Sequence, residues 1–349
     1  NPGGENLPAE RSTVRSSVRN YLLTKDANPD FSSIWNVIGL QRSGLYVPWS
    51  YTATFYQNVY AYCEQKNWKL TRTKYSDYSK LIMALTSIGI DAQNVGGHNL
   101  FDYLSDYENV RMQGINGPIW ALIALDSGDY EVPEDAYQSR EEILAELLKA
   151  QESDGGFSLS AGSGQMDVDI TAMALTALAP YYEENSEAKA AADLALSWLS
   201  EHQESDGGFC SSMDTGTESS ESCAQVLTAL CSLGIDPQSD SRFIKNGNTV
   251  LDNLMSFRQE DGGFVHAYVY DASNPASIPD ESDFLAGGQA AYALTAFCRY
   301  KNNMKNLFNL RPEKASLLSK NGSAMPVMVI VAVIAAAVVL MLKRRNKKE

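Results

Sequence analysis

The chain alternates between two kinds of helical segment. One kind is built almost entirely of Ala, Leu, Thr and other apolar residues, and the other carries charges on one side only. A helix that is apolar all round is buried, whereas a striped helix exposes one side to water. The apolar kind recurs six times, at residues 35–44, 82–89, 119–125, 173–178, 226–230 and 292–297.

An amphipathic segment precedes each apolar one. These segments lie near residues 10–24, 50–66, 98–106, 138–151, 187–203 and 245–259. We therefore predict an all-α domain over residues 10–300, with about twelve helices in six hairpins, the apolar helices forming an inner layer. Six such hairpins can close into a ring, an α/α toroid, which removes exposed repeat ends. Residues 1–9 form an N-terminal extension.

Three turns repeat one design. They read QESDGGF at 151–157, QESDGGF at 203–209 and RQEDGGF at 258–264, a period typical of repeat architectures. The paired glycines allow positive φ at the end of each outer helix. Gln151 and Gln203 can bond the free carbonyls of that helix end. We interpret these motifs as structural fasteners rather than as chemistry.

The C-terminus predicts a membrane anchor. Residues 325–342 carry no charge and would span roughly 27 Å as a helix, close to the thickness of a bilayer core. The basic tail at 343–349 predicts a cytoplasmic end, which places residues 1–324 outside the cell. Residues 301–324 would then be a short polar tether. The chain begins at Asn1 rather than Met, which leaves open a signal peptide or further domains before it.

The net charge and the spacing of the cysteines and histidines exclude two classes of binding partner, nucleic acid and zinc. The formal net charge is −15, so the surface repels phosphate backbones and nucleic acid is not an expected partner. The five cysteines lack metal-type spacing and are expected to pack as small apolar residues. The three histidines are far apart in the sequence, so they do not form the clustered ligand set that a zinc site requires.

The Gln-x3-Gly-x-Phe turns joined to Ala-Leu helices resemble the α/α toroid superfamily. That superfamily includes protein prenyltransferase β subunits, class II terpene and squalene cyclases, and the cobalamin carriers transcobalamin and intrinsic factor. The resemblance covers about residues 10–300. The stretch QGINGPIWALIALDSGDYEVP at 113–133 is typical of bacterial surface proteins with prenyltransferase/squalene-oxidase-type repeats, which often carry a transcobalamin-like domain as well. The resemblance implies the fold and leaves the function open.

Two enzymatic readings follow from the resemblance. The zinc-dependent prenyltransferases place Asp-x-Cys at the start of one inner helix and His on another. Here Glu221-Ser222-Cys223 matches only loosely, and the last repeat offers Gln289 without a His, so no metal site is predicted.

Class II cyclases protonate their substrate with the middle Asp of a DxDD motif. This chain reads DVDI at 167–170, which makes Asp169, with Asp167 beside it, the candidate catalytic acid. The plainer alternative is that either aspartate caps the inner helix that follows.

The third reading is ligand binding. Cobalamin carriers have a related Asp-Thr-Ala-Ala-Met-Ala stretch at the mouth of the ring, which DITAMA at 169–174 approaches with one residue inserted. Equivalent helix positions form a rim, and a second set lies one turn deeper. The rim is Ser79, Asn116, Asp169, Glu221 and Gly288, and the deeper layer is Met83, Trp120, Met173, Gln225 and Tyr292. A polar rim over an apolar, aromatic throat suits a large amphipathic ligand.

The hypothesis is a cell-surface toroid that binds such a ligand without catalysis, with cobalamin or another corrinoid as the candidate. The predicted ligand-binding residues are Asn116, Trp120, Asp169, Glu221, Gln225, Gln289 and Tyr292. In cobalamin carriers the ligand lies between the toroid and a second, β domain, so a missing domain of that kind is a possible partner. The alternatives are a toroid enzyme that uses Asp169 as acid, and a surface interaction scaffold without a ligand.

Overall fold

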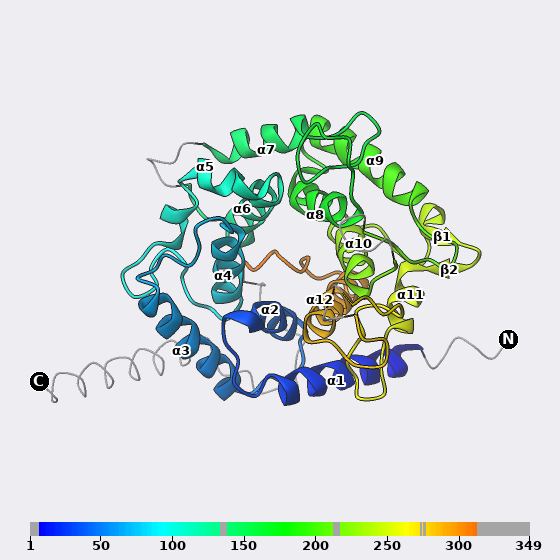
Figure 1. Ribbon diagram of the computed structural model, residues 1–349, viewed down its shortest axis with the longest axis horizontal. Coiled ribbons are helices and arrows are strands. Elements are labelled where there is room, and N and C mark those ends of the chain that lie inside the picture. Colours follow the sequence, from blue (N-terminus) through cyan, green and yellow to red (C-terminus); the bar gives the residue numbers. More distant parts are fainter. Residues whose placement is uncertain (1–6, 133–137, 212–216, 273, 275–276, 313–349) are drawn as a thin grey trace, which may run out of the picture.

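The computed structural model describes residues 7–132, 138–211, 217–272, 274 and 277–312, and it shows two concentric rings of helices (Figure 1). The predicted α/α toroid is confirmed, with twelve α-helices in the described residues. The inner ring consists of α2 (Ile34–Arg42), α4 (Ser76–Ser87), α6 (Asn116–Ser127), α8 (Val168–Leu178), α10 (Ser220–Ser232) and α12 (Phe284–Lys301). The outer ring consists of α1 (Leu7–Lys25), α3 (Trp49–Gln65), α5 (Tyr107–Val110), α7 (Arg140–Lys149), α9 (Ser186–Glu201) and α11 (Val250–Ser256).

Short elements connect these helices. They are the 3-10 turns η1 (Phe31–Ser33), η2 (Leu100–Tyr103), η3 (Arg111–Gln113), η4 (Ala179–Tyr181) and η5 (Ser241–Phe243), and the two-stranded hairpin of β1 (Ile244–Lys245) and β2 (Asn248–Thr249). The hairpin pairs Ile244 with Thr249 and Lys245 with Asn248. Asn246 and Gly247 take positive φ at its tip, the combination that a two-residue hairpin turn favours.

Each inner helix packs against the next, and α12 packs against α2 to close the ring. The closure depends on small residues. A Cβ on Gly39 of α2 would lie 3.1 Å from the backbone nitrogen of Tyr292, and one on Gly288 would lie 2.4 Å from Oδ1 of Asn36. Gly288, placed in the rim by its spacing, is therefore a packing position. In α6 and α10 nearly every residue is buried, as the apolar pattern predicted.

The outer helices pair differently from the prediction. The sequence paired each outer helix with the inner helix that follows it. The observed contacts instead join α7 to α6, α9 to α8 and α11 to α10, and α1 packs on α12. Because α1 comes first and α12 last, this contact also holds the two ends of the ring together.

Two predicted outer helices are shorter than expected. The helix expected over 98–106 is replaced by η2 and α5, because Asn99 and Asp106 each cap a new turn with their side chains. The helix expected over 245–259 begins only at Val250, after the β1–β2 hairpin, where Thr249 caps it. Both differences arise from polar residues that compete with the helical backbone for hydrogen bonds.

The Asp-Gly-Gly-Phe turns join one repeat to the next. Gln151 Nε2 donates to Gly155 O at 2.8 Å and to Ala191 O of α9 at 2.7 Å. Gln203 Nε2 donates in the same way to Gly207 O and to Phe243 O. The two glutamines do act as fasteners, but the expected bonds to the carbonyls of the preceding helix end are wrong, because both amides bond the turn glycine and the following repeat instead.

The first glycine of each turn lies against that following repeat. Gly155, Gly207 and Gly262 all have φ above +90°. A Cβ there would come within 2.7 Å of Leu194 O, 2.5 Å of Thr249 O and 2.5 Å of the Ser17 hydroxyl, respectively. Since Ser17 belongs to α1, the third turn fastens the last repeat to the first, and Arg258 also donates to Ser17 Oγ at 3.0 Å.

The described part of the expected tether packs against the ring instead of leaving it. Residues 301–312 cross behind the space enclosed by the inner helices (Figure 1). Leu307 is fully buried, and Phe308 is 6% exposed. The Phe308 ring lies 5.9 Å from that of Trp120, 6.3 Å from Tyr292 and 6.5 Å from Trp35, so it closes the throat from that side.

Backbone contacts hold this closing segment in place. The Arg42 guanidinium, at the end of α2, donates to the carbonyls of Asn306, Leu307 and Asn309 at 2.8–3.0 Å. Leu310 N donates to Ser127 O at the end of α6 at 2.7 Å. Residues 301–312 are therefore part of the domain, and residues 313–324 of the expected tether lie outside the described residues.

Within the described residues, the structure has no helix of the length and apolarity that crossing a bilayer requires. The predicted anchor at 325–342, the basic tail at 343–349 and most of the extension at 1–9 lie outside the described residues.

Glu218 lies in an unfavourable place for a charge. Its carboxyl group packs over Gly208 and accepts a hydrogen bond of 3.3 Å from Asn253 Nδ2. Burial and a hydrogen bond with Asp206 raise its pKa from the ordinary 4.5 to about 7. The folded state therefore keeps a proton on Glu218 at pH values where the unfolded chain has lost it.

The first prediction concerns Phe308. Phe308→Ala should lower the free energy of unfolding by about 3–5 kcal/mol, because it removes a buried ring and leaves a cavity in the throat. Urea denaturation followed by circular dichroism measures this. Met304→Ala, which is 42% exposed in the same segment, should change stability by about 0.5 kcal/mol or less. Equal effects of the two variants would show that the segment does not close the throat.

The second prediction concerns pH. Because unfolding releases the Glu218 proton between pH about 4.5 and 7, this residue makes stability fall as the pH rises through that range. Glu218→Gln should make the loss of Tm between pH 5 and pH 8 smaller than in the wild type. Glu183→Gln removes an exposed carboxylate and is the matched control. Identical pH profiles for both variants would contradict the assignment.

Candidate functional site

The N-terminal ends of the inner helices form one mouth of the ring. Asp167 caps α8 there, since its Oδ1 accepts hydrogen bonds from the backbone nitrogens of Asp169 at 2.9 Å and Ile170 at 3.1 Å. The Ser211 hydroxyl donates to its other carboxyl oxygen at 2.7 Å. Asp167 is 1% exposed and engaged on both oxygens, so its role is that of a helix cap.

Two predicted ligand-binding residues line one cavity at this mouth. The cavity has a volume of about 450 Å³ and lies between the starts of α6 and α8. Asn116 and Asp169 supply its polar side, and Met173 lies one turn deeper, as the helical spacing predicted. The amide oxygen of Asn116 is buried and has no hydrogen-bond partner among the described residues. A ligand that donates a hydrogen bond would satisfy it. The lining consists of Met112, Gln113, Gly114, Asn116, Leu159, Ser160, Asp169, Ile170, Met173 and Ser211.

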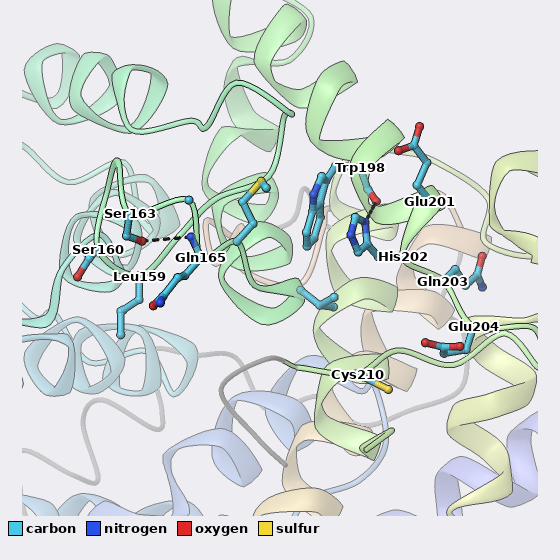
Figure 2. A pocket seen from close by; sticks show the side chains of 13 residues that line it. Leu159, Ser160, Ser163, Gln165, Trp198, Glu201, His202, Gln203, Glu204 and Cys210 are labelled. Carbon is cyan, nitrogen blue, oxygen red and sulfur yellow. Dashed lines mark hydrogen bonds between the residues drawn. The ribbon is translucent and has the colours of Figure 1, made fainter. Parts of the chain in front are cut away.

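A larger groove adjoins this cavity. Its volume is about 870 Å³, and Leu159 and Ser160 line both spaces. Figure 2 shows the groove between the loop that carries Gln165 and the end of α9. The His202 ring stacks on Trp198 at 3.8 Å, and its Nδ1 lies 2.7 Å from Trp198 O. A carbonyl only accepts, so Nδ1 carries a proton in this contact.

Three other predicted residues form a closed hydrogen-bond network rather than a cavity wall. Gln225 Nε2 donates to Gln289 Oε1 at 3.0 Å and to Tyr292 Oη at 2.7 Å. The Tyr292 hydroxyl in turn donates to Gln289 Oε1 at 3.0 Å. Burial, with the charges of Asp169 and Glu221 nearby, holds the pKa of Tyr292 well above its ordinary value. The phenol therefore stays a neutral donor, and the network fastens α10 to α12.

The carboxylate of Glu221 contacts His266, which the sequence did not connect with the site. Its Oε2 lies 2.8 Å from Nδ1 of His266 and accepts a bond of 3.1 Å from the Ser220 hydroxyl. The Nε2 atom of His266 lies 3.1 Å from the amide nitrogen of Asn274. These partners assign the Nδ1 proton to the side facing the carboxylate. His266 comes from a loop without periodicity, so no sequence signal linked it to α10.

Trp120 belongs to the floor of the throat. Its ring lies 5.1 Å from that of Trp35, and Phe308 packs on both from the opposite mouth. It is 2% exposed. The structure thus divides the seven predicted residues into the cavity pair Asn116 and Asp169, the hydrogen-bond network of three, Glu221 paired with His266, and Trp120 in the aromatic floor.

Comparison with known proteins agrees with this architecture. A family model described as the prenyltransferase alpha-alpha toroid domain matches residues 98–274, just over half of the chain. The chain belongs to this family. A search of curated proteins found no match.

The structure places the residues on which the two enzymatic interpretations depend. Among the described residues, no group of three or more His, Cys, Asp or Glu side chains is arranged to hold a metal ion. Cys223, the cysteine of the loose Asp-x-Cys match, is fully buried, and burial raises the pKa of its thiol well above the ordinary value. Asp169 lies at the cavity and is the acidic side chain of its lining.

The third prediction tests the polar network of this toroid. Tyr292→Phe should lower the free energy of unfolding by about 1–2 kcal/mol, because it removes the hydroxyl that joins Gln225 to Gln289 in a buried setting. Chemical denaturation measures the change. Tyr46→Phe, at a residue 75% exposed, is the control and should change stability by less than about 0.5 kcal/mol. A loss that is no larger for Tyr292→Phe would refute the network's contribution.

Proposed function

We propose that this toroid is a non-catalytic binding module for a large amphipathic ligand. The ligand would bind at the mouth formed by the N-terminal ends of the inner helices. The observation that carries the proposal is the pair of adjoining spaces at that mouth. The Asn116–Asp169 cavity and the adjoining groove share Leu159 and Ser160 and have volumes of about 450 and 870 Å³. Spaces of this size suit ligands well above the size of a simple metabolite.

The lining fits a ligand with an apolar body and polar edges. Apolar surface comes from Met112, Ile170 and Met173, and the polar groups are mostly amides, hydroxyls and carboxylates. No Lys or Arg lines either space. A corrinoid has an apolar macrocycle edged by amide groups, which makes it the first ligand to test.

Closure of the throat favours binding over catalysis. Cyclisation of an isoprenoid needs an apolar cavity that excludes water from a reactive cation. In this toroid Phe308 packs against Trp35, Trp120 and Tyr292 where a deep cavity would lie. The ligand therefore occupies the mouth and remains in contact with solvent. The alternative, a cyclase-like enzyme, is motivated by the position of Asp169 at the cavity, and it requires that the closing segment move.

We further propose that the domain is displayed at the cell surface by a single membrane segment at 325–342. The support is the uncharged stretch of eighteen residues followed by five basic residues in the last seven. Membrane fractionation of cells that express the full chain, compared with a chain ending at residue 312, tests this. Recovery of both chains in the soluble fraction would refute the anchor.

The fourth prediction concerns ligand binding. A thermal-shift screen of the full chain in detergent would include cobalamin, other corrinoids, isoprenoid diphosphates and an isoprenoid epoxide. A ligand that binds only the folded state at about 100 times its Kd stabilises the protein by about 2.7 kcal/mol. We expect a corrinoid to raise Tm, and Asn116→Ala and Asp169→Asn to weaken that binding about tenfold or more, as expected for lost polar contacts. Met304→Ala, outside the mouth, is the matched control.

The possible outcomes separate the functions. A corrinoid-dependent shift that Asn116→Ala abolishes supports the binding module. Turnover of the isoprenoid epoxide, lost in Asp169→Asn, would refute the binding function and support the enzyme. A flat response to the whole panel would favour an interaction scaffold.

A further inference from the structure

A second cavity lies at the mouth that the closing segment covers. It has a volume of about 450 Å³ and is bounded by the C-terminal ends of α6, α8 and α10 and by residues 306–311 of that segment. The cavity that contains Asn116 and Asp169 lies at the N-terminal ends of the inner helices, so the two spaces are on opposite sides of the throat. The function proposed above does not use this second cavity.

The hydroxyl groups that line this cavity already donate their protons within the protein. Ser127, Thr176 and Ser232 lie in the last turns of α6, α8 and α10, and each donates to a backbone carbonyl of its own helix at 2.8–3.1 Å. The Tyr181 hydroxyl donates to Asp126 Oδ2 at 2.8 Å. A hydroxyl has one proton and two lone pairs, so each of these oxygens can only accept from a ligand.

Two further features favour a ligand that donates hydrogen bonds. The amide oxygen of Asn309, in the closing segment, is buried and has no partner among the described residues. Three inner helices end at the cavity. The last carbonyls of a helix lack partners within the helix, and that end carries a partial negative charge. The walls are therefore rich in acceptors and electronegative.

The charged side chains add to this negative potential. The cavity is lined by Asp126, Asp129 and Glu184 and by two arginines. Both arginines are paired: Arg140 Nε donates to Asp126 Oδ1 at 2.7 Å, and Arg311 Nη2 lies 2.8 Å from Asp129 Oδ1. Arg140 also donates to two backbone carbonyls, at 2.6 and 3.3 Å. Glu184 is exposed and has no ion pair among the described residues. One carboxylate at the cavity is thus left without a counter-charge.

We propose that this cavity binds a primary ammonium group on a short aliphatic chain. The three N–H donors of the ammonium would meet the hydroxyl oxygens and the Asn309 amide, and its charge would compensate Glu184 and the helix ends. The aliphatic chain would pack against Ile123, Ala177 and Pro180, which line the same cavity. This site is separate from the one proposed at the other mouth and does not depend on it.

The experiment uses four probes with one butyl chain and different head groups: butylamine, butyltrimethylammonium, butanol and butyrate. Titration of the full chain in detergent, followed by saturation-transfer NMR, measures each Kd. We expect butylamine to bind at least about tenfold more tightly than butanol, and butyrate to bind more weakly than butanol, because the cavity is electronegative. Butyltrimethylammonium carries the charge without N–H donors, so it should bind more weakly than butylamine.

Two matched pairs of variants locate the site. Glu184→Gln removes the carboxylate without a counter-charge, and Glu183→Gln removes an exposed carboxylate that does not line the cavity. Ser232→Ala removes a hydroxyl oxygen of the cavity, and Ser87→Ala removes a hydroxyl that donates to its own helix in the same way at the end of α4. Only Glu184→Gln and Ser232→Ala should weaken butylamine binding, each by about threefold or more.

Two more probes identify the source of the ammonium group. Putrescine represents a free amine, and Nα-acetyl-lysine amide represents a lysine side chain of another protein. Because the cavity is bounded on one side by the closing segment, we expect putrescine to bind more tightly. Tighter binding of the lysine derivative would overturn the assignment to a free amine.

Three other results would overturn the inference: no binding of butylamine, no preference for butylamine over butanol and butyltrimethylammonium, or equal losses within either matched pair of variants. A corrinoid-dependent thermal shift beside absent butylamine binding would refute this site and leave the proposed function standing. Selective butylamine binding beside a flat thermal-shift panel would do the reverse.

Discussion

The ring depends on the close approach of each repeat to the next at the Asp-Gly-Gly-Phe turns. At these turns a glycine with positive φ lies within contact distance of the neighbouring repeat, and any side chain would push the two apart. Glutamine amides then bond the turn and the neighbouring repeat together. Because the third turn meets Ser17 of α1, the same contact that stacks repeats also closes the circle.

A closed ring of helices has two mouths. In this protein a segment of the chain packs across one of them, and no such segment is described at the other. At one mouth, Arg42 and Ser127 hold the segment that carries Phe308, whose ring fills the throat, and a cavity of about 450 Å³ lies between this segment and the ends of α6 and α8. At the other, the starts of α6 and α8 leave a cavity and a groove. The closing segment fills the throat from one side, so the open space described at the other mouth lies at its polar rim.

The sequence predicted the candidate site in part. Helical spacing placed Asn116 and Asp169 at equal height on adjacent helices, and both line one cavity. The same spacing placed Gln225 and Tyr292 correctly in depth, but it could not show that they bond each other instead of a ligand. His266 and Phe308 lie in segments without periodicity, so nothing in the sequence connected them to the ring.

The sequence by itself determined that this protein is a two-layer helical ring, because burial requires apolar helices inside striped ones and the turns recur at a fixed period. Tertiary structure alone decided which helices pair, since α1 packs on α12 at the far end of the chain. It also decided that residues 301–312 close the throat. The physical reason is that periodicity fixes which face of a helix is buried, whereas the identity of the neighbour depends on shape and on contacts between residues distant in sequence.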